Sequence, residues 1–475
     1  MTAYSSSALG DLMDDVLDNA VRRYVSEFGW YGSADEGFRG NNWDGELPPN
    51  FGPTGMVTLK LNAIAQSASS DVPPGAQYVG QETRGSVVYH VYEVDAYESI
   101  YSPWVDRLHQ VFDGWRSLPD PADFDAPIAA LEDAVDAITP QSQREGGYTF
   151  VDVEVSTAMG LIYKWASPQS DQASSDLLYA FDGGYGVDRI TGVMVNQAQV
   201  AAGAGLAVAG EKQVWKKART DIMAIAQAGA DSLDIGGGGS GSIDLGVVKA
   251  FVDLVGVFVP AQFDVLVDAA SEGLAFLDEV TPEPKTGNKT LTLSGGTAEE
   301  IFASLEDAVK ELEQAIYDEE SELQTKLQAL QGILGDNDPV NFHLHPGAGM
   351  AETFVDAAEI RINSRTIQSI GNHDVPIVAK AFLRAAEFAA SHTGSGIWSR
   401  DHSIGMGSYG PHASWLAALE QLDAITTGSA KELIDAGRTL AVAAGWIEDA
   451  DDQAAADMGG LADELARGQD HWAPA

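Results

Sequence analysis

The feature that most constrains the fold is a run of regularly spaced aliphatic residues in the second half of the chain. Their spacings of three, four or seven place them on one stripe of a helix of about 35 residues, roughly 50 Å long at 1.5 Å per residue. Thr297 and Glu300 form a capping box that predicts the start of this helix. The stripe consists of Leu305, Val309, Leu312, Ile316 and Leu323, here called the helix seam, and it continues to Leu330.

The positions around the helix seam are mostly Glu, Asp and Gln, so this helix has a single apolar face. Five large aliphatic side chains left in water would each forfeit roughly 1.5–3 kcal/mol. We therefore expect the seam to pack against another helix, from this chain or from a partner, and we expect the opposite acidic face, with Glu313, to stay in solvent.

The middle of the chain also has helical periodicity. Beyond Thr191 it is rich in alanine, with apolar residues three and four apart between Leu206 and Ile225, which predicts helix. The longest apolar segment, Ile243 to Val259, is interrupted by charged residues and glycines and is short for a bilayer span. We expect it to form a buried helix, and we expect no transmembrane segment.

The last third of the chain predicts a helical hairpin. Apolar residues at helical spacing between Trp415 and Ile425 indicate a first amphipathic helix, and the small polar residues 427–429 interrupt it. Ser429 and Glu432 then form a second capping box. The segment Pro411 to Met458 is accordingly predicted to contain two helices that pack against each other.

The first third of the chain mixes helix and strand. Leu12 to Phe28 predicts a short helix, whereas Val57 to Leu61 alternates apolar and polar residues with the period of two typical of a half-buried strand. Val87 to Val94 is β-branched and aromatic, and Val151 to Val155 alternates again, so both are predicted strands. A further short strand is expected at Thr290 to Leu293.

These patterns together predict a mainly α protein, a helical bundle with long helical hairpins and a smaller mixed α/β N-terminal region. The length of 475 residues favours more than one domain. The expected regions are a mixed α/β part at 1–190, a helical segment at 191–280 with a Gly-rich linker at 236–242, and a C-terminal helical bundle at 281–475.

Charge and cysteine content limit the classes of partner and chemistry. The chain has 71 acidic and 27 basic residues, a formal net charge of -44, so nucleic acids and anionic membrane surfaces are disfavoured as partners. It contains no cysteine, which removes disulfides, thiol nucleophiles and thiolate metal sites. Met1 to Asp18 lacks the basic start and apolar stretch of a signal peptide, so we expect a cytoplasmic protein or one secreted without a cleavable signal.

A group of histidines and aspartates is the one set of residues that suggests metal chemistry. Gly371-Asn372-His373-Asp374 resembles a ligand element of the binuclear metallophosphoesterases, which deliver their ligands from loops after parallel strands. Here His373 falls between two helical patterns, so we expect no metal, no cofactor and no catalytic residue. The alternative, a metal-dependent phosphoesterase, would use Asp336, His343, His345, His373, Asp374 and His402.

Several tryptophans are predicted to pack in the core, because packing is the usual role of such large apolar side chains in an acidic helical protein. This applies to Trp115 and Trp215, which occupy helix-compatible positions, and to Trp446 in the last predicted helix.

Three stretches resemble the actinobacterial helical proteins associated with type VII (ESX) secretion, the wider group to which the Trp-x-Gly proteins belong. They are Phe112 to Pro121, Asn196 to Trp215 with its Gly210-Glu211-Lys212-Gln213-Val214-Trp215 end, and the predicted hairpin at 411–458. The resemblance implies a non-catalytic helical protein that is exported folded, paired or oligomerised. No Tyr-x-x-x-Asp/Glu signal follows the final predicted helix, so a co-exported partner would supply it.

The sequence thus favours a secretion-associated binding or structural protein that acts through a protein partner or as a homo-oligomer. Two other readings stay open: the phosphoesterase described above, and a phage or surface-layer structural or assembly protein, which high acidity and the absence of cysteine equally permit.

Overall fold

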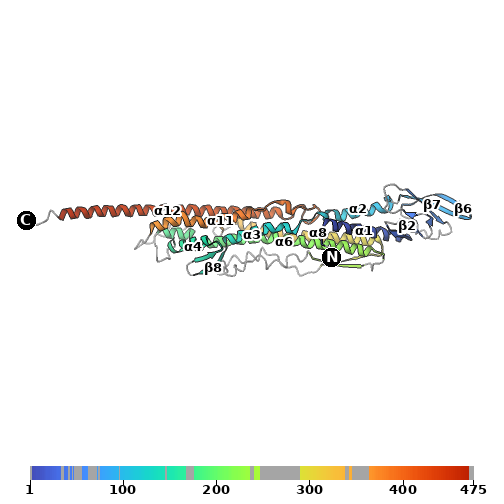
Figure 1. The fold of residues 1–475 in the computed structure, drawn as a ribbon, viewed down its shortest axis with the longest axis horizontal. Helices are drawn as coiled ribbons and strands as arrows, with labels where there is room; N and C mark the ends of the chain where they lie inside the picture. The colour runs from blue at the N-terminus through green and yellow to red at the C-terminus, as the bar shows by residue number, and fades with distance from the viewer. Residues whose placement is uncertain are drawn as a thin grey trace, which may run out of the picture.

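The fold was analysed in a computed structural model of the chain (Figure 1). It describes residues 3–469 except for 34–36, 41–42, 45, 48–55, 63–71, 73–74, 96, 145–146, 167–175, 236–239, 247–288, 337–341 and 345–362. The α-helices are α1 (Ser6–Ser26), α2 (Ser102–Phe112), α3 (Asp125–Ile138), α4 (Val153–Ala166), α5 (Asp176–Tyr185), α6 (Val187–Leu233), α8 (Ala298–Asp336), α10 (Ser364–Ser369), α11 (Val375–Ala390) and α12 (His412–Gln469).

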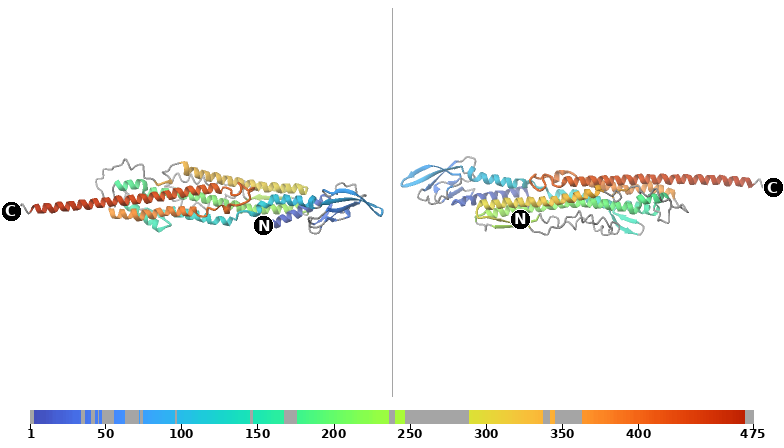
Figure 2. Two further views of the ribbon diagram at one scale, coloured as in Figure 1. Left: turned by 90° about the horizontal axis from the view of Figure 1, so that it is seen from above. Right: turned by 180° about the vertical axis from the view of Figure 1, so that it is seen from behind.

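The molecule is an elongated bundle of helices that lie roughly along one axis (Figure 1). The strands between residues 30 and 95 gather at one end of this rod, and α12 runs past the other end without a neighbouring helix, as three views agree (Figure 2). The protein is therefore mainly α with a few small antiparallel sheets, which confirms the predicted fold class.

The central helix of the bundle is α6, which packs against α1, α3, α8 and α12. It is rich in Ala and Gly and is buried over most of its length, because small side chains allow helices to surround it closely. The stretch Phe181–Leu233 is long and apolar enough to cross a membrane, but 89% of its most apolar window is buried inside the protein. It is thus the core helix of the bundle and no clear membrane span. Through α6, the three predicted regions share one hydrophobic core.

Helix α8 begins at the predicted capping box. The Glu300 backbone N–H donates to Thr297 Oγ1 at 3.2 Å, and the Thr297 N–H donates to Glu300 Oε2 at 3.3 Å. All five residues of the helix seam are at most 3% exposed, and α6 is the main helix that covers this side of α8. The opposite side differs from the expectation: Glu313 is half-buried, and Glu319 and Glu320 are buried.

Helix α12 is continuous from His412 to Gln469, so the prediction of a hairpin at 411–458 is wrong. The predicted break at 427–429 stays helical because Ser429 is buried and its hydroxyl accepts a hydrogen bond from Gln197 Nε2 of α6 at 2.9 Å. In a helix cap this hydroxyl would accept from a backbone N–H of the next turn. Here it accepts from Gln197 of α6 instead, so it does not end one helix and begin another.

The partner of α12 is the helical run formed by α10, the π-helical turn η8 (Ile370–Asp374) and α11. The two pass closely at a pair of glycines. A Cβ atom on Gly371 would lie 2.3 Å from the Gly437 carbonyl oxygen, and one on Gly437 would lie 2.6 Å from that of Gly371. Only glycine fits both positions without a shift of the backbone.

The strands are β1 (Trp30–Ser33), β2 (Gly37–Gly40), β3 (Trp43–Asp44), β4 (Glu46–Leu47), β5 (Met56–Asn62), β6 (Gln77–Arg84), β7 (Val87–Asp95), β8 (Pro140–Arg144), β9 (Gly147–Phe150), β10 (Ser240–Leu245) and β11 (Lys289–Ser294). The sheets have the orders β1-β2-β4, β3-β5-β7-β6, β8-β9 and β10-β11, with antiparallel neighbours. Strands β5, β7 and β11 confirm three of the predicted strands.

Two local predictions are wrong. Val151 to Val155 is not a strand, because Asp152 Oδ1 accepts from the backbone N–H of Glu154 at 2.8 Å and so begins helix α4. Residues 240–242 of the predicted linker belong to strand β10, which also includes the start of the apolar segment 243–259. The rest of the predicted linker, 236–239, and the rest of the apolar segment, 247–259, lie outside the described residues.

Candidate functional site

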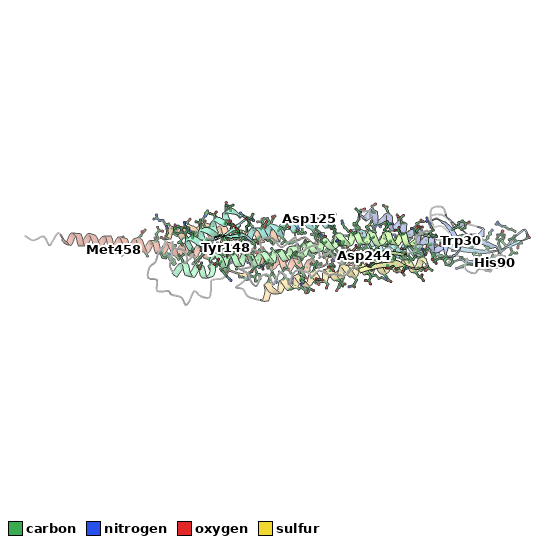
Figure 3. The ribbon with its side chains drawn as sticks, turned by 90° about the horizontal axis from the view of Figure 1, so that it is seen from below. Trp30, His90, Asp125, Tyr148, Asp244 and Met458 are labelled. Carbon is green, nitrogen blue, oxygen red and sulfur yellow. The ribbon has the colours of Figure 1, made fainter. Side chains whose placement is uncertain are left out.

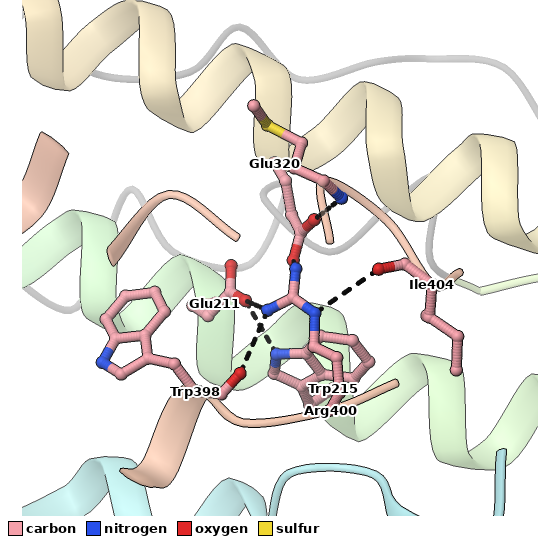
Figure 4. Close-up of polar contacts among 7 residues, drawn as sticks. Glu211, Trp215, Glu320, Trp398, Arg400 and Ile404 are labelled. Atoms are coloured by element: carbon pink, nitrogen blue, oxygen red, sulfur yellow. Dashed lines mark hydrogen bonds and ion pairs between the residues drawn. The ribbon is translucent and has the colours of Figure 1, made fainter. Parts of the chain in front are cut away.

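The most unusual chemistry in the body of the rod is a buried arginine between two glutamates (Figure 4). Arg400 lies in the connection between α11 and α12, Glu211 on α6 and Glu320 on α8. The side chains of all three have no solvent exposure. Three segments far apart in the sequence thus place charged groups together in the core.

Hydrogen bonds hold the Arg400 guanidinium on each of its edges. Nη2 donates to Glu320 Oε1, Nη1 lies 3.4 Å from both Glu211 Oε1 and the Trp398 carbonyl oxygen, and Nε lies 3.5 Å from the Ile404 carbonyl oxygen. The guanidinium carbon also lies 4.8 Å from the centre of the Trp215 ring. The arginine therefore has both an ionic and an aromatic neighbour.

Each glutamate also accepts from a second donor. Trp215 Nε1 donates to Glu211 Oε1 at 2.7 Å, and the Met406 backbone N–H donates to Glu320 Oε2 at 2.6 Å. Glu211 Oε2 is buried without a hydrogen-bond donor among the described residues. Glu211 Oε2 can therefore carry a proton without losing a hydrogen bond.

Two carboxylates and one guanidinium cannot all be charged in a dry core without one uncompensated negative charge. Burial raises the pKa of Glu320 well above its usual value, and the adjacent Glu211 raises the pKa of Glu320 further, whereas Arg400 lowers it. Burial likewise raises the pKa of Glu211, against the lowering effects of Arg400 and of hydrogen bonds. We infer that the two glutamates share one proton, which neutralises the cluster.

The connection around Arg400 is built for this contact. Gly405 and Gly410 have φ angles of +61° and +49°, a backbone conformation that favours glycine. A Cβ atom on Gly405 would lie 2.3 Å from Glu320 Oε2, and one on Gly410 would lie 2.5 Å from Arg400 Nη2. The cluster therefore clamps the connection onto α6 and α8. Without solvent exposure its groups reach no substrate, so its role in this arrangement is structural.

The residues considered for metal binding are not brought together. His373 and Asp374 lie in the π-helical turn η8, with His373 Nδ1 at 3.1 Å from Asp374 Oδ1, and not after a strand. His402 is exposed in the α11–α12 connection next to Asp401. The backbone oxygen of His343 accepts from Arg189 at 3.0 Å.

His345 and the side chain of Asp336 lie outside what the structure describes. Among the described side chains, no three metal-ligating groups come together.

The predicted core tryptophans separate into two groups. Trp115 and Trp215 are at most 1% exposed, in the segments that carry the family resemblance. Trp446 is 71% exposed, so its assignment to the core is wrong. Arg365 and Gln368 of α10 bond to Glu448, two residues further along α12, so Trp446 points to the side of α12 that faces away from α10.

This exposed end of α12 is the candidate interaction surface. Val442, Trp446, Ala450, Ala454 and Met458, here called the α12 ridge, are all exposed and each lies four residues after the last. Val442 and Met458 are 52% and 72% exposed. Met458 lies on the projecting part of α12, far from His90 at the strand end of the rod (Figure 3).

The sequence reasoning missed both Arg400 and the α12 ridge. Arg400 lies in a Gly- and Ser-rich stretch without periodicity, and its partners are 189 and 80 residues away. The ridge could have been found from the i, i+4 spacing of its residues, but the same spacing also describes a buried helix face.

Comparison with known proteins adds no relative. The chain matches no protein family, no curated protein and no solved structure.

Proposed function

We propose that this chain is a non-catalytic binding or structural protein that engages another protein through the exposed end of α12. The observation that carries the proposal is the α12 ridge, in which Trp446 and Met458 are more than two thirds exposed on a helix that continues past its own bundle. Contiguous exposed apolar side chains on a monomer are typical of interaction sites.

The remaining chemistry of the described residues supports a binding role. The charged groups with strongly perturbed environments, Glu211, Glu320 and Arg400, are closed off from solvent and hold a connection in place. The long helices of the rod hold its strand-containing end and the exposed end of α12 far apart (Figure 1). The 58 residues of α12 alone span about 87 Å at 1.5 Å per residue.

An association with type VII secretion is the more specific part of the proposal. Support for it comes from the sequence segments 112–121 and 196–215, whose tryptophans Trp115 and Trp215 are packed in the helical core. In this proposal the protein travels folded, and its α12 ridge is covered by the protein with which it is exported or assembled.

Site-specific photo-crosslinking in the source cells tests the binding role. A photoreactive residue in place of Met458 is expected to give one dominant protein adduct, identified by mass spectrometry. The matched control replaces Lys310, whose side chain is 68% exposed on α8, and should give none. Equal adducts at both positions, or none at Met458, would remove the support for a binding role at this end.

Export is tested separately by comparing culture medium and cells with and without the secretion ATPase. Loss of the protein from the medium in the ATPase deletion is expected. A protein that never reaches the medium in either strain would refute the secretion part and leave the binding part standing.

A further inference from the structure

The α12 ridge has the geometry that helices use to pack against each other. Residues four apart form the ridges that fit into the grooves of a neighbouring helix in the commonest class of helix packing. The ridge runs from Val442, opposite the last packed turns, to Met458 on the projecting part, with Trp446 as its largest side chain. A second helix laid along it would bury a tryptophan and a methionine.

The charge around the ridge is of one sign only. Between Arg438 and Arg467 the sequence contains seven acidic residues and no lysine or arginine. Three of the acids, Asp449, Asp452 and Asp457, are exposed on the described part of α12. Asp449 and Asp457 each directly precede a ridge residue and so border the ridge on one side, whereas Asp452 lies on the opposite face of the helix. A helix that docks here meets apolar side chains bordered by carboxylates.

The protein's own packing shows which chemistry suits this helix. At the last covered turn, Arg365 Nε of α10 lies 2.8 Å from Glu448 Oε1, and Gln368 Nε2 donates to Glu448 Oε2 at 2.8 Å. Helix α10 is thus joined to α12 by an arginine and an amide that both donate to a carboxylate. An occupant further along α12 would find the same acceptors.

A second copy of this chain does not fit these requirements. In either orientation, two α12 ridges packed together would bring acidic residues of both copies side by side, with no basic residue of this stretch to compensate. Like charges at such spacing oppose association and select against the wrong partner.

We propose that the occupant of the α12 ridge is an amphipathic helix of a different protein, with an apolar stripe bordered by lysine or arginine. This inference rests on the proposed binding function and specifies the partner of the same surface. Its apolar stripe would cover Trp446 and Met458, and its basic residues would face Asp449 and Asp457.

The probe for this proposal is a synthetic, dye-labelled 21-residue helix with leucine on one face and lysine elsewhere. A second peptide has glutamate at every lysine position. Binding to the full-length protein is measured by fluorescence anisotropy at about 150 mM salt. At this ionic strength the Debye length is about 8 Å, so long-range charge attraction is limited. We expect the lysine peptide to bind and the glutamate peptide to bind at least 100-fold more weakly.

Variants separate the ridge from the general acidity of the protein. Trp446→Gln/Met458→Gln leaves the net charge unchanged and should weaken lysine-peptide binding at least tenfold. Asp449→Asn/Asp457→Asn should weaken binding and flatten its dependence on salt. The matched control Val79→Gln/Val153→Gln replaces two other exposed apolar residues, 51% and 74% exposed, and should leave the affinity unchanged.

Three results would overturn the proposal. The first is equal binding of the lysine peptide by the parent and the Trp446→Gln/Met458→Gln variant, which would show charge attraction alone. The second is a dimer in sedimentation that this variant dissociates, which would make the occupant a second copy. The third is a Met458 photo-crosslink to a protein whose crosslinked segment is not basic; the binding function would then stand while the partner class fails.

Discussion

Helices α8 and α12 both carry an apolar stripe at helical spacing, but they have different surroundings. In α8 the helix seam is covered along its length, and even Glu319 and Glu320 on the flanks are buried. In α12 the first half packs against α11 and α6. Trp446 is exposed on the side away from α10, and Met458 is exposed on the turns that project from the body (Figure 3).

The comparison teaches that an apolar stripe alone does not say what covers it. Isolated helices are marginally stable in water, but a helix that is already nucleated by packing can be extended at little cost. Helix α12 therefore continues past its partners, and its apolar residues become available to another protein. In α8 the same kind of residue contributes to the stability of the bundle.

The largest expected effect is on the covered helix. Leu312→Asp removes a fully buried leucine and places a carboxylate in the helix seam, so we expect a loss of about 5 kcal/mol or more in the free energy of unfolding. Denaturant melts of this variant and of the milder Leu312→Ala, expected to lose about 2–5 kcal/mol, measure the effect.

The control for Leu312 is Gln314→Lys, an exposed position of α8 next to Asp318, expected to change stability by less than about 0.5 kcal/mol. Glu313 is a poor control, because burial and the nearby Asp401 raise the pKa of this half-buried carboxyl. A Leu312→Asp variant that melts like the parent would show that the seam is not packed as described.

The next largest effect concerns the cluster that joins α8 to the rest of the bundle. Arg400→Met leaves the carboxyl groups of Glu211 and Glu320 without their buried cation and should cost about 3–5 kcal/mol. Arg438→Met on α12 removes an arginine that is 72% exposed and should cost less than about 1 kcal/mol. Comparable losses in the two variants would contradict a special role for the buried arginine.

A smaller effect depends on pH. The pKa values of Glu211 and Glu320 are raised by burial, so the folded protein holds more protons than the unfolded chain above the usual glutamate pKa of 4.5. The stability from the shared proton is present below that pH and is lost as pH rises through the raised pKa values. The parent should therefore be less stable at pH 8 than at pH 5 through this cluster.

Glu211→Gln tests that sign. The amide keeps an oxygen that accepts from Trp215 and Arg400 and, like a protonated carboxyl group, carries no charge at any pH. We expect the variant to gain about 1 kcal/mol over the parent at pH 8 and to lose this advantage at pH 5. Chemical melts at both pH values measure the change, with the exposed Asp307→Asn as control. An advantage that grows toward low pH would contradict the shared proton.

The smallest expected effect is on the uncovered helix. Trp446→Gln and Met458→Gln each remove an exposed apolar side chain, so the free energy of unfolding should change by less than about 0.5 kcal/mol. Thermal melts of the purified protein decide the result. A loss above about 2 kcal/mol would mean that the ridge is covered within the protein itself, and the contrast between α8 and α12 would disappear.

The sequence predicted those elements whose signal is local. The Thr297–Glu300 capping box places the start of α8 correctly, because both hydrogen-bond partners lie within one helical turn. The alternation at Val57 to Leu61 and the β-branched run at Val87 to Val94 predict β5 and β7. Predictions from local patterns were wrong where one side-chain hydrogen bond decided the structure. Asp152 accepts from a backbone N–H and begins a helix, and Ser429 accepts from Gln197 of another helix.

The amino-acid sequence by itself therefore determined the mainly helical fold class, the start of α8 and its single apolar face, since these depend on spacing along the chain. Only the tertiary structure decided which apolar faces are covered and which acids are buried. Arg400 meets Glu211 and Glu320 across 189 and 80 residues, and Trp446 lies in solvent because it points away from the neighbouring helix α10. Burial depends on which segments meet in space, a property that no local pattern contains.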